Sequence, residues 1–145
     1  MPTLHTLRWS DIWFLVSLYY CSLRGQSKLR DVIAAADAIN HAVMNFEELS
    51  SALVRLEEHG LIEVEGNPWR VKCTQKGHDC VEPAARENSL AFRVRKAVEQ
   101  TLHVHGWIPK EPIPHPENSL HYKGFTKDDY DKEVAEYLEA MHTKS

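Results

Sequence analysis

Residues 45–77 decide the fold, and they read N-F-E-E-L-S-S-A-L-V-R-L-E-E-H-G-L-I-E-V-E-G-N-P-W-R-V-K-C-T-Q-K-G. Asn45 is a favourable helix N-cap, and Glu48 three residues later completes a capping box. Gly60 supplies the left-handed residue that commonly ends a helix. Two short runs of alternating apolar and charged residues then predict two strands joined at residues 66–67. The stretch therefore predicts a capped helix, a glycine stop and a tight hairpin.

Alternation within the hairpin predicts which side chains face the core. The inward positions are Ile62, Val64, Trp69, Val71 and Cys73. A two-residue loop would place Glu63 opposite Arg70, whereas Pro68 beside the turn leaves this register open.

Two helices are expected before this stretch. Ser10 caps the first, over residues 11–21, and Ser27 caps the second, which ends near residues 40–41. The first helix is apolar on two faces, and such a helix must be covered on both sides. One face meets its own core, so the other requires the C-terminal segment or a second chain.

After Gly77 the sequence predicts mostly helix. A long helix is expected over residues 84–105, following an interruption at Pro83. Four prolines make residues 107–116 an extended arm. Thr126 with Asp129 caps a terminal helix, whose narrow apolar stripe is expected to pack on the first helix. We therefore divide the chain into a domain of residues 1–82 and a helical extension of residues 83–145.

Composition excludes several classes of function. The chain has 145 residues and a net charge of −4, with 8 basic against 11 acidic residues in 1–82 and 9 against 10 in 83–145. This balance gives no global attraction to nucleic acid. No apolar run reaches the length of a membrane span, and three widely spaced cysteines indicate a reducing cytoplasm. Catalytic, metal-binding and cofactor-binding motifs are absent, so we expect neither an enzyme nor a cofactor.

The runs E-L-S-S-A-L-V-R-L-E-E-H-G-L-I, residues 48–62, and W-R-V-K-C-T-Q-K-G, residues 69–77, resemble winged helix-turn-helix transcriptional regulators of the MarR-like and PadR-like groups. In those proteins the recognition helix ends in a G-L-I or G-L-V turn, and the wing closes on a T-x-x-G helix start. The resemblance covers about residues 10–82, and residues 83–145 lie outside it. It implies three helices with a two-stranded wing. Together with the pattern after Gly77, this gives an α+β, mostly helical fold in which a long fourth helix, the arm and a terminal helix follow the wing.

The resemblance implies a DNA-binding surface. The expected contacts are Ser50, Ser51 and Arg55 on the helix of residues 45–58, Asn67, Arg70 and Lys72 on the wing, and Lys28 and Arg30 at the start of the second helix. One departure from the family weakens this expectation. Helical spacing points Glu47, Ser51, Val54, Arg55 and Glu58 outward, and carboxylates aimed at phosphates oppose DNA binding.

Each basic group also has an ordinary structural interpretation. Arg70 and Lys72 could simply pair across the hairpin with Glu63 and Glu65. A basic stripe on the long helix could be a solvated face; its members are Arg86, Arg93, Lys96 and Gln100.

The leading prediction is a DNA-binding transcriptional regulator that acts as a cytoplasmic homodimer on double-stranded DNA. Dimerisation would cover the second apolar face of the first helix. The expected interface residues are Trp13, Phe14, Leu18, Tyr130, Val134 and Tyr137.

Two alternatives remain open. The domain could be a protein–protein interaction module, without nucleic acid, whose acidic helix meets a basic partner. It could also sense a ligand between the first helix and the arm, through Trp13, Tyr19, Tyr20 and Trp107. The ordinary role of such aromatic residues is core packing.

Overall fold

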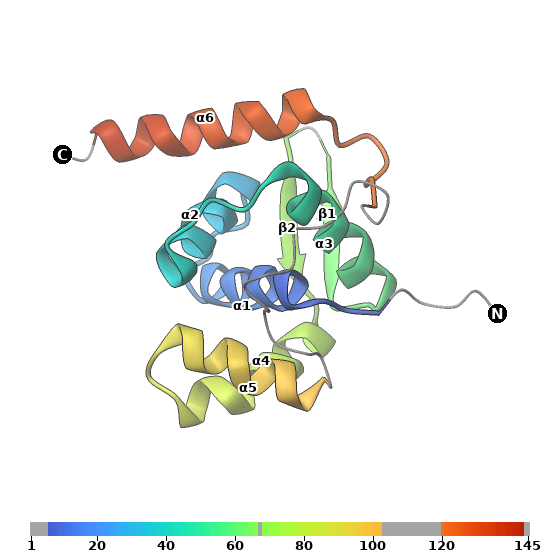
Figure 1. Cartoon of the computed structure of the whole chain (residues 1–145), viewed down its shortest axis with the longest axis vertical. Coiled ribbons are helices and arrows are strands. Elements are labelled where there is room, and N and C mark those ends of the chain that lie inside the picture. The colour runs from blue at the N-terminus through green and yellow to red at the C-terminus, as the bar shows by residue number, and fades with distance from the viewer. Residues whose placement is uncertain (1–5, 67, 103–119, 144–145) are drawn as a thin grey trace, which may run out of the picture.

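The computed structural model describes residues 6–66, 68–102 and 120–143. Across them the fold is α+β and mostly helical, with one two-stranded antiparallel sheet (Figure 1). The elements are α1 (Trp9–Leu23), α2 (Leu29–Asn40), α3 (Phe46–Glu58), β1 (Ile62–Glu65), β2 (Arg70–Cys73), α4 (Gln75–Glu87), α5 (Ala91–Thr101) and α6 (Lys127–Thr143). The arrangement is compatible with a winged-helix layout. The predicted arm of residues 107–116 lies outside the described residues, as does Trp107.

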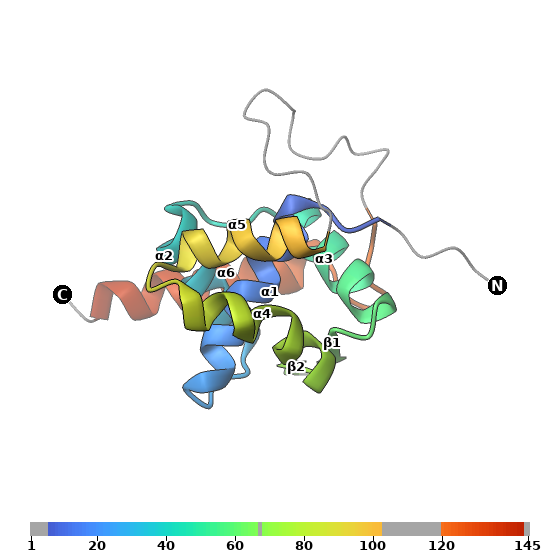
Figure 2. The same cartoon turned by 90° about the horizontal axis from the view of Figure 1, so that it is seen from below.

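Helix α1 is the centre of the molecule. Helices α2 and α3 and strand β2 pack on one part of it, and the α4–α5 pair packs on the other (Figures 1 and 2). Helix α6 lies across α2, on the far side of the molecule from α4 and α5. The core therefore consists of one continuous cluster around α1.

The starts of α1 and α2 differ from the sequence prediction. Helix α1 begins at Trp9, and its N-cap is Arg8 rather than Ser10, because the Asp11 carboxylate accepts the Arg8 N–H at 2.8 Å. Helix α2 is capped at Lys28 rather than Ser27. The Ser27 carbonyl instead accepts a hydrogen bond from the backbone of β2.

The predicted ends of α3 are confirmed. The Asn45 side chain accepts the Glu48 N–H at 2.8 Å, and the Glu48 carboxylate accepts the Asn45 N–H at 3.0 Å. This reciprocal pair satisfies two donors that a helix start otherwise leaves unpaired. Gly60, at φ +72°, ends the turn that follows the helix.

The hairpin register corrects the predicted two-residue loop. Glu63 lies opposite Lys72, and Glu65 lies opposite Arg70, which settles the register that Pro68 had left open and excludes the pairing of Glu63 with Arg70 that a two-residue loop would give. The connection spans residues 66–69, since Trp69 turns into the core instead of continuing the strand. A bridge between Lys28 and Arg70 joins the start of α2 to the other edge of β2.

The predicted long helix of residues 84–105 is wrong, because two helices form in its place. Helix α4 continues through Pro83 to Glu87, and Asn88 ends it by donating its side-chain amide to the Ala84 carbonyl at 2.9 Å. Helix α5 then runs back along α4. Two short helices can bury Val81, Val94 and Val98 together beside α1, which a single straight helix could not do. The predicted basic stripe is accordingly split between α4 and α5.

The second apolar face of α1 is covered within the chain. Trp13, Phe14 and Leu18 are 0–1% exposed, and α4 and α5 contact the helix that carries them. The terminal helix packs on α2 instead of α1, contrary to prediction, and two tyrosine hydroxyls fix it. Tyr130 donates to the Met44 carbonyl at 2.6 Å, and Tyr137 donates to the Asp37 carboxylate at 2.5 Å.

Candidate functional site

The surface of α3 that the resemblance assigns to DNA is closed at its three predicted contact residues. Ser50 and Ser51 are 0% exposed and Arg55 is 3% exposed. The prediction that Ser51 and Arg55 point outward is therefore wrong. The charged side chains of α3 that solvent reaches are those of Glu47, Glu57 and Glu58.

Residues 120–126, which we call the C-terminal strap, cover this side of α3. The Ser50 hydroxyl accepts the Tyr122 N–H at 2.8 Å. The Ser51 hydroxyl accepts the Leu120 N–H at 2.9 Å and donates to the Leu120 carbonyl at 3.4 Å. The two serines thus bind the main chain of a segment some 70 positions away, so helical periodicity alone could not predict their burial.

Aromatic packing holds the end of the strap. The Phe125 ring is 4% exposed and lies 5.1 Å from the Trp69 ring, edge-on, and 5.7 Å from the Phe46 ring, stacked. Tyr122 meets Trp69 edge-on at 6.1 Å, and Tyr130 meets Phe46 edge-on at 5.9 Å. Such pairs contribute about 0.5–1.5 kcal/mol each beyond the area that they bury. The cluster joins α3, the hairpin, the strap and α6.

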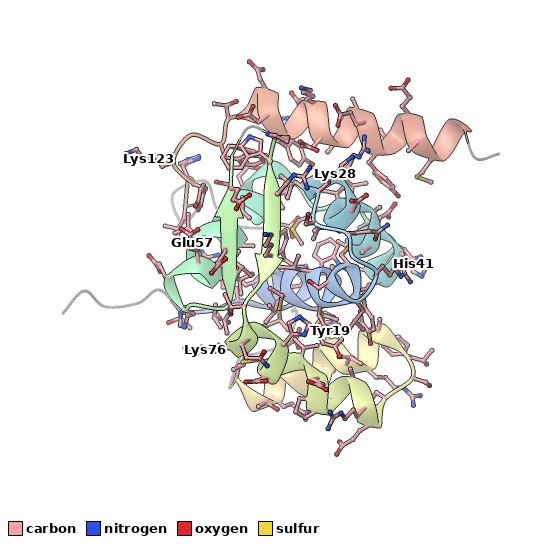
Figure 3. The ribbon with its side chains drawn as sticks, turned by 180° about the vertical axis from the view of Figure 1, so that it is seen from behind. Tyr19, Lys28, His41, Glu57, Lys76 and Lys123 are labelled. Carbon is pink, nitrogen blue, oxygen red and sulfur yellow. The ribbon has the colours of Figure 1, made fainter. Side chains whose placement is uncertain are left out.

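A group of exposed carboxylates flanks the turn between α3 and β1, and we call it the acidic rim. Its members are Glu57 and Glu58 at the end of α3, and Glu63 and Glu65 on β1; all four are exposed. Tyr122 donates its hydroxyl to Glu57 at 2.8 Å, and burial together with this bond raises the pKa of Tyr122 to about 12. Figure 3 shows Glu57 beside β1, with Lys123 of the strap on the same side of the molecule.

Arg55 takes part in a buried ion pair. Its guanidinium lies 3.4 Å from the Asp11 carboxylate at the start of α1, and both side chains are almost fully buried. Burial raises the pKa of Asp11 to about 6, although the positive charge of Arg55 opposes that rise. The pair ties α3 to α1, so Arg55 is unavailable to a DNA base in this structure.

The basic residues predicted for the wing and for α2 divide into a neighbouring set on and beside β2 and one residue that is paired elsewhere. Arg70 and Lys72 are exposed on β2, and each lies opposite a glutamate of β1. Lys28 is exposed and bridges to Arg70 through the backbone, so these two cations are neighbours. Arg30 is half-buried and pairs with Glu136 of α6 at 3.7 Å. Asn67 lies outside the described residues.

The six residues predicted for a dimer interface serve the single chain. Trp13, Phe14 and Leu18 fill the core, and Trp13 also donates its indole N–H to the Ala36 carbonyl at 2.8 Å. Tyr130 and Tyr137 are buried and Val134 is half-buried on the inner side of α6. The apolar argument for a second chain therefore does not hold. Among the aromatic residues proposed to line a ligand pocket, Tyr19 is buried and contacts His78, while Tyr20 is half-buried.

A hollow of about 420 Å³ lies between α2 and α6. Alanines line its α2 side, Tyr137 and Met141 line its α6 side, and Arg24, Arg30 and Asp31 lie around it. Two of these charged residues are arginines, and one of them, Arg30, is already paired with Glu136. Within the described ranges, no cluster of three or more ligating side chains could hold a metal ion.

Comparison with known proteins gives no relative. No family model matches the chain, nor does any curated protein or solved structure. Among the helices that the structure describes, none is long and apolar enough to cross a membrane.

Helical periodicity did not predict that the strap packs on α3. A signal was present in L-H-Y-K-G-F, residues 120–125, where two aromatic residues and two bases follow the proline-rich arm. An amphipathic helix pattern was absent there, so periodicity gave no reason to expect an extended segment that packs on α3.

Proposed function

We propose that this chain is a winged-helix protein–protein interaction module whose acidic rim receives a basic segment of a partner protein. One observation carries the proposal: α3, the helix expected to read DNA, is covered by the strap and keeps only carboxylates as its solvent-reached charges. Carboxylates repel phosphate and attract lysine and arginine.

The rim is suited to a basic partner because its four carboxylates are exposed and flank the turn at Gly60. Glu57 and Glu58 precede Gly60, and Glu63 and Glu65 follow it. Exposed charge chiefly speeds association and selects against like-charged partners. Glu63 and Glu65 lie opposite Lys72 and Arg70, so the proposal relies mainly on Glu57 and Glu58. Strand β1 pairs with β2 at one edge. At its other edge it pairs with no strand among the described residues.

Phage display tests this proposal. Random dodecapeptides are selected on the immobilised full chain, and the enriched sequences are synthesised and measured by fluorescence anisotropy. We expect enrichment of lysine and arginine, and binding at least about tenfold weaker to a Glu57→Lys/Glu58→Lys variant, because the attractive charges are reversed.

The matched control is Glu87→Lys/Glu139→Lys, which changes the net charge equally at exposed sites on α4 and α6. Equal weakening by both double variants would show that only net charge matters and would contradict a site at the rim. Failure to enrich any peptide whose binding depends on Glu57 would contradict the proposed function.

A second candidate is the DNA-binding homodimer, which the adjacency of Lys28 and Arg70 favours. These cations could meet phosphates while a second chain supplies the other half-site. Anisotropy with random duplex DNA at two salt concentrations tests it. Binding that weakens as salt rises, and that Lys28→Ala/Arg70→Ala removes, would support this candidate over the first.

A further inference from the structure

The face of α3 beneath the strap carries two serine hydroxyls beside Phe46, and both serines are fully buried. Ser50 and Ser51 are 0% exposed, and the hydroxyl partners on this face are main-chain groups of Leu120 and Tyr122. A surface that stays buried is usually apolar, because a buried hydroxyl destabilises the fold when it loses its hydrogen-bond partner. Water can also hydrogen-bond to the hydroxyls of Ser50 and Ser51, so this serine face suits a surface that is covered in one state and open in another.

These serines recognise an extended main chain rather than particular side chains. Ser51 binds both the N–H and the carbonyl of residue 120, and Ser50 binds the N–H of residue 122. Alternate residues of an extended segment point to the same side, so residues 120 and 122 present their polar groups together. Serine also lets a backbone approach α3 closely.

Selectivity comes from two aromatic side chains and from charge. Tyr122 reaches Trp69 and Glu57, and Phe125 inserts between Phe46 and Trp69. Lys123 of the strap is exposed and lies on the same side of the molecule as Glu57 (Figure 3).

We propose that the serine face of α3 is a docking surface for an extended basic peptide with aromatic residues three positions apart, and that the strap occupies it in cis as a competitor. This inference rests on the proposed function and names the segment that a partner would supply. The strap is covalently attached, so its effective concentration is high and a partner must displace it. The closed structure is then the inhibited state of the module.

A labelled synthetic peptide tests the docking surface. The probe has the sequence N-S-L-H-Y-K-G-F-T-K, residues 118–127, and anisotropy measures its binding to full-length wild type and to a Tyr122→Ala/Phe125→Ala variant. We expect the variant to bind the probe at least about tenfold more tightly, because its own strap competes poorly. Equal affinity for both proteins, or binding to neither, would overturn the proposal.

Two controls assign the contacts. A probe with alanine in place of both aromatic residues should lose binding. Adding Ser50→Val to the strap variant should also weaken binding, since the hydroxyl that accepts the peptide N–H is lost.

A Leu120→Pro variant weakens the strap without touching its aromatic residues, because it removes the N–H that Ser51 accepts. It should bind the probe more tightly than wild type does, and it provides the same test if the Tyr122→Ala/Phe125→Ala variant fails to fold.

Hydrogen exchange on the unmodified chain tests whether the strap opens independently. The amides of Leu120 and Tyr122 should exchange at least about tenfold faster than that of Leu53 in the core of α3. Exchange of all three at one common rate would overturn a separately opening strap.

The two proposals can fail separately. If displayed peptides bind the rim through Glu57 but the strap probe binds no variant, the docking inference fails and the proposed function stands. If the strap probe binds the weakened variant while the Glu57→Lys/Glu58→Lys change has no effect on any peptide, the docking surface stands and the acidic rim is not the recognition element.

Discussion

At the residue scale, the Asp11–Arg55 pair shows how burial changes a side chain's role. Arg55 was expected to face a DNA groove, whereas it neutralises a carboxylate at the start of α1. Asp11 also accepts the Arg8 N–H, so the same carboxylate caps a helix and anchors α3. The pair is costly to desolvate, yet removal of one member leaves a buried charge without its partner.

Arg55→Met should therefore destabilise the protein, although it preserves the apolar length of the side chain. We expect a loss of about 3 kcal/mol at pH 7 in urea unfolding, because Asp11 is left buried and uncompensated. Arg86→Met is the matched control: Arg86 pairs with Glu82 on the surface and is 77% exposed. A comparable loss in both variants would mean that Arg55 contributes no more than a surface pair does.

The pKa of Asp11 predicts how stability depends on pH. Burial raises it from 3.8 to about 6. Because the folded-state pKa lies above the unfolded value, the stabilising contribution is complete below pH 3.8 and is lost as pH rises through about 6. As pH rises from 4 to 7, the unfolding free energy of Asp11→Asn minus that of wild type should increase by up to about 3 kcal/mol, because only wild type loses the contribution of Asp11. Unfolding curves across that range measure it, and parallel profiles for the two proteins would contradict the assignment.

At the element scale, the contact between α4 and the hairpin explains the T-x-K-G sequence. Thr74 caps α4 by accepting the Gly77 N–H at 3.0 Å, and its hydroxyl donates to the Gly60 carbonyl at 2.7 Å. Gly77 is buried, and a Cβ there would lie 2.3 Å from the Leu61 carbonyl oxygen and 2.8 Å from the Cys73 sulfur. The glycine is required by close approach of two elements and not by its backbone angles.

Gly77→Ala should therefore destabilise the protein, although alanine is the better helix former. Intrinsic propensity favours alanine by about 1 kcal/mol, but the backbone oxygen of Leu61 cannot move aside as a flexible side chain would. We expect a net loss of about 1–3 kcal/mol in thermal or urea unfolding. Gly25→Ala provides a contrast, since no atom lies within 4 Å of its Cβ and only the φ of +71° opposes it. A stabilised Gly77→Ala protein would contradict the close packing of α4 on the hairpin.

At the scale of the whole molecule, two C-terminal additions enclose a three-helix centre. Helices α4 and α5 cover one side of α1, and α6 with the strap covers α2 and α3 (Figures 1 and 2). Each addition buries a surface that the sequence had assigned to a partner. The single chain thereby completes its own core.

We expect the chain to sediment as a monomer at micromolar concentration, because Trp13, Phe14 and Leu18 are already covered. The exposed apolar residues of the described part are scattered over several elements, and they are Leu23, Val43, Leu90, Phe92, Leu138 and Met141. Isolated apolar residues on a surface do not require a partner. A stable dimer in sedimentation velocity would contradict this expectation and would favour the DNA-binding candidate.

Local chemistry made much of the fold predictable. The capping box of Asn45 and Glu48, the stop at Gly60 and the alternation of the two strands each depend on residues within a few positions. The break at Asn88 was not predictable in the same way, because a continuous helix satisfies the local pattern equally well. Contact with α1 selects the two shorter helices.

The sequence by itself determined the helix boundaries around α3, the hairpin and the acidic character of α3, since these follow from neighbouring residues. Only the tertiary structure decided which face of α3 solvent reaches. Ser51 and Arg55 look outward on a helical projection, but Leu120 and Asp11 approach them from distant parts of the chain, as Tyr122 approaches Ser50. Burial is a property of all the elements packed around a residue, whereas periodicity describes only the helix to which it belongs.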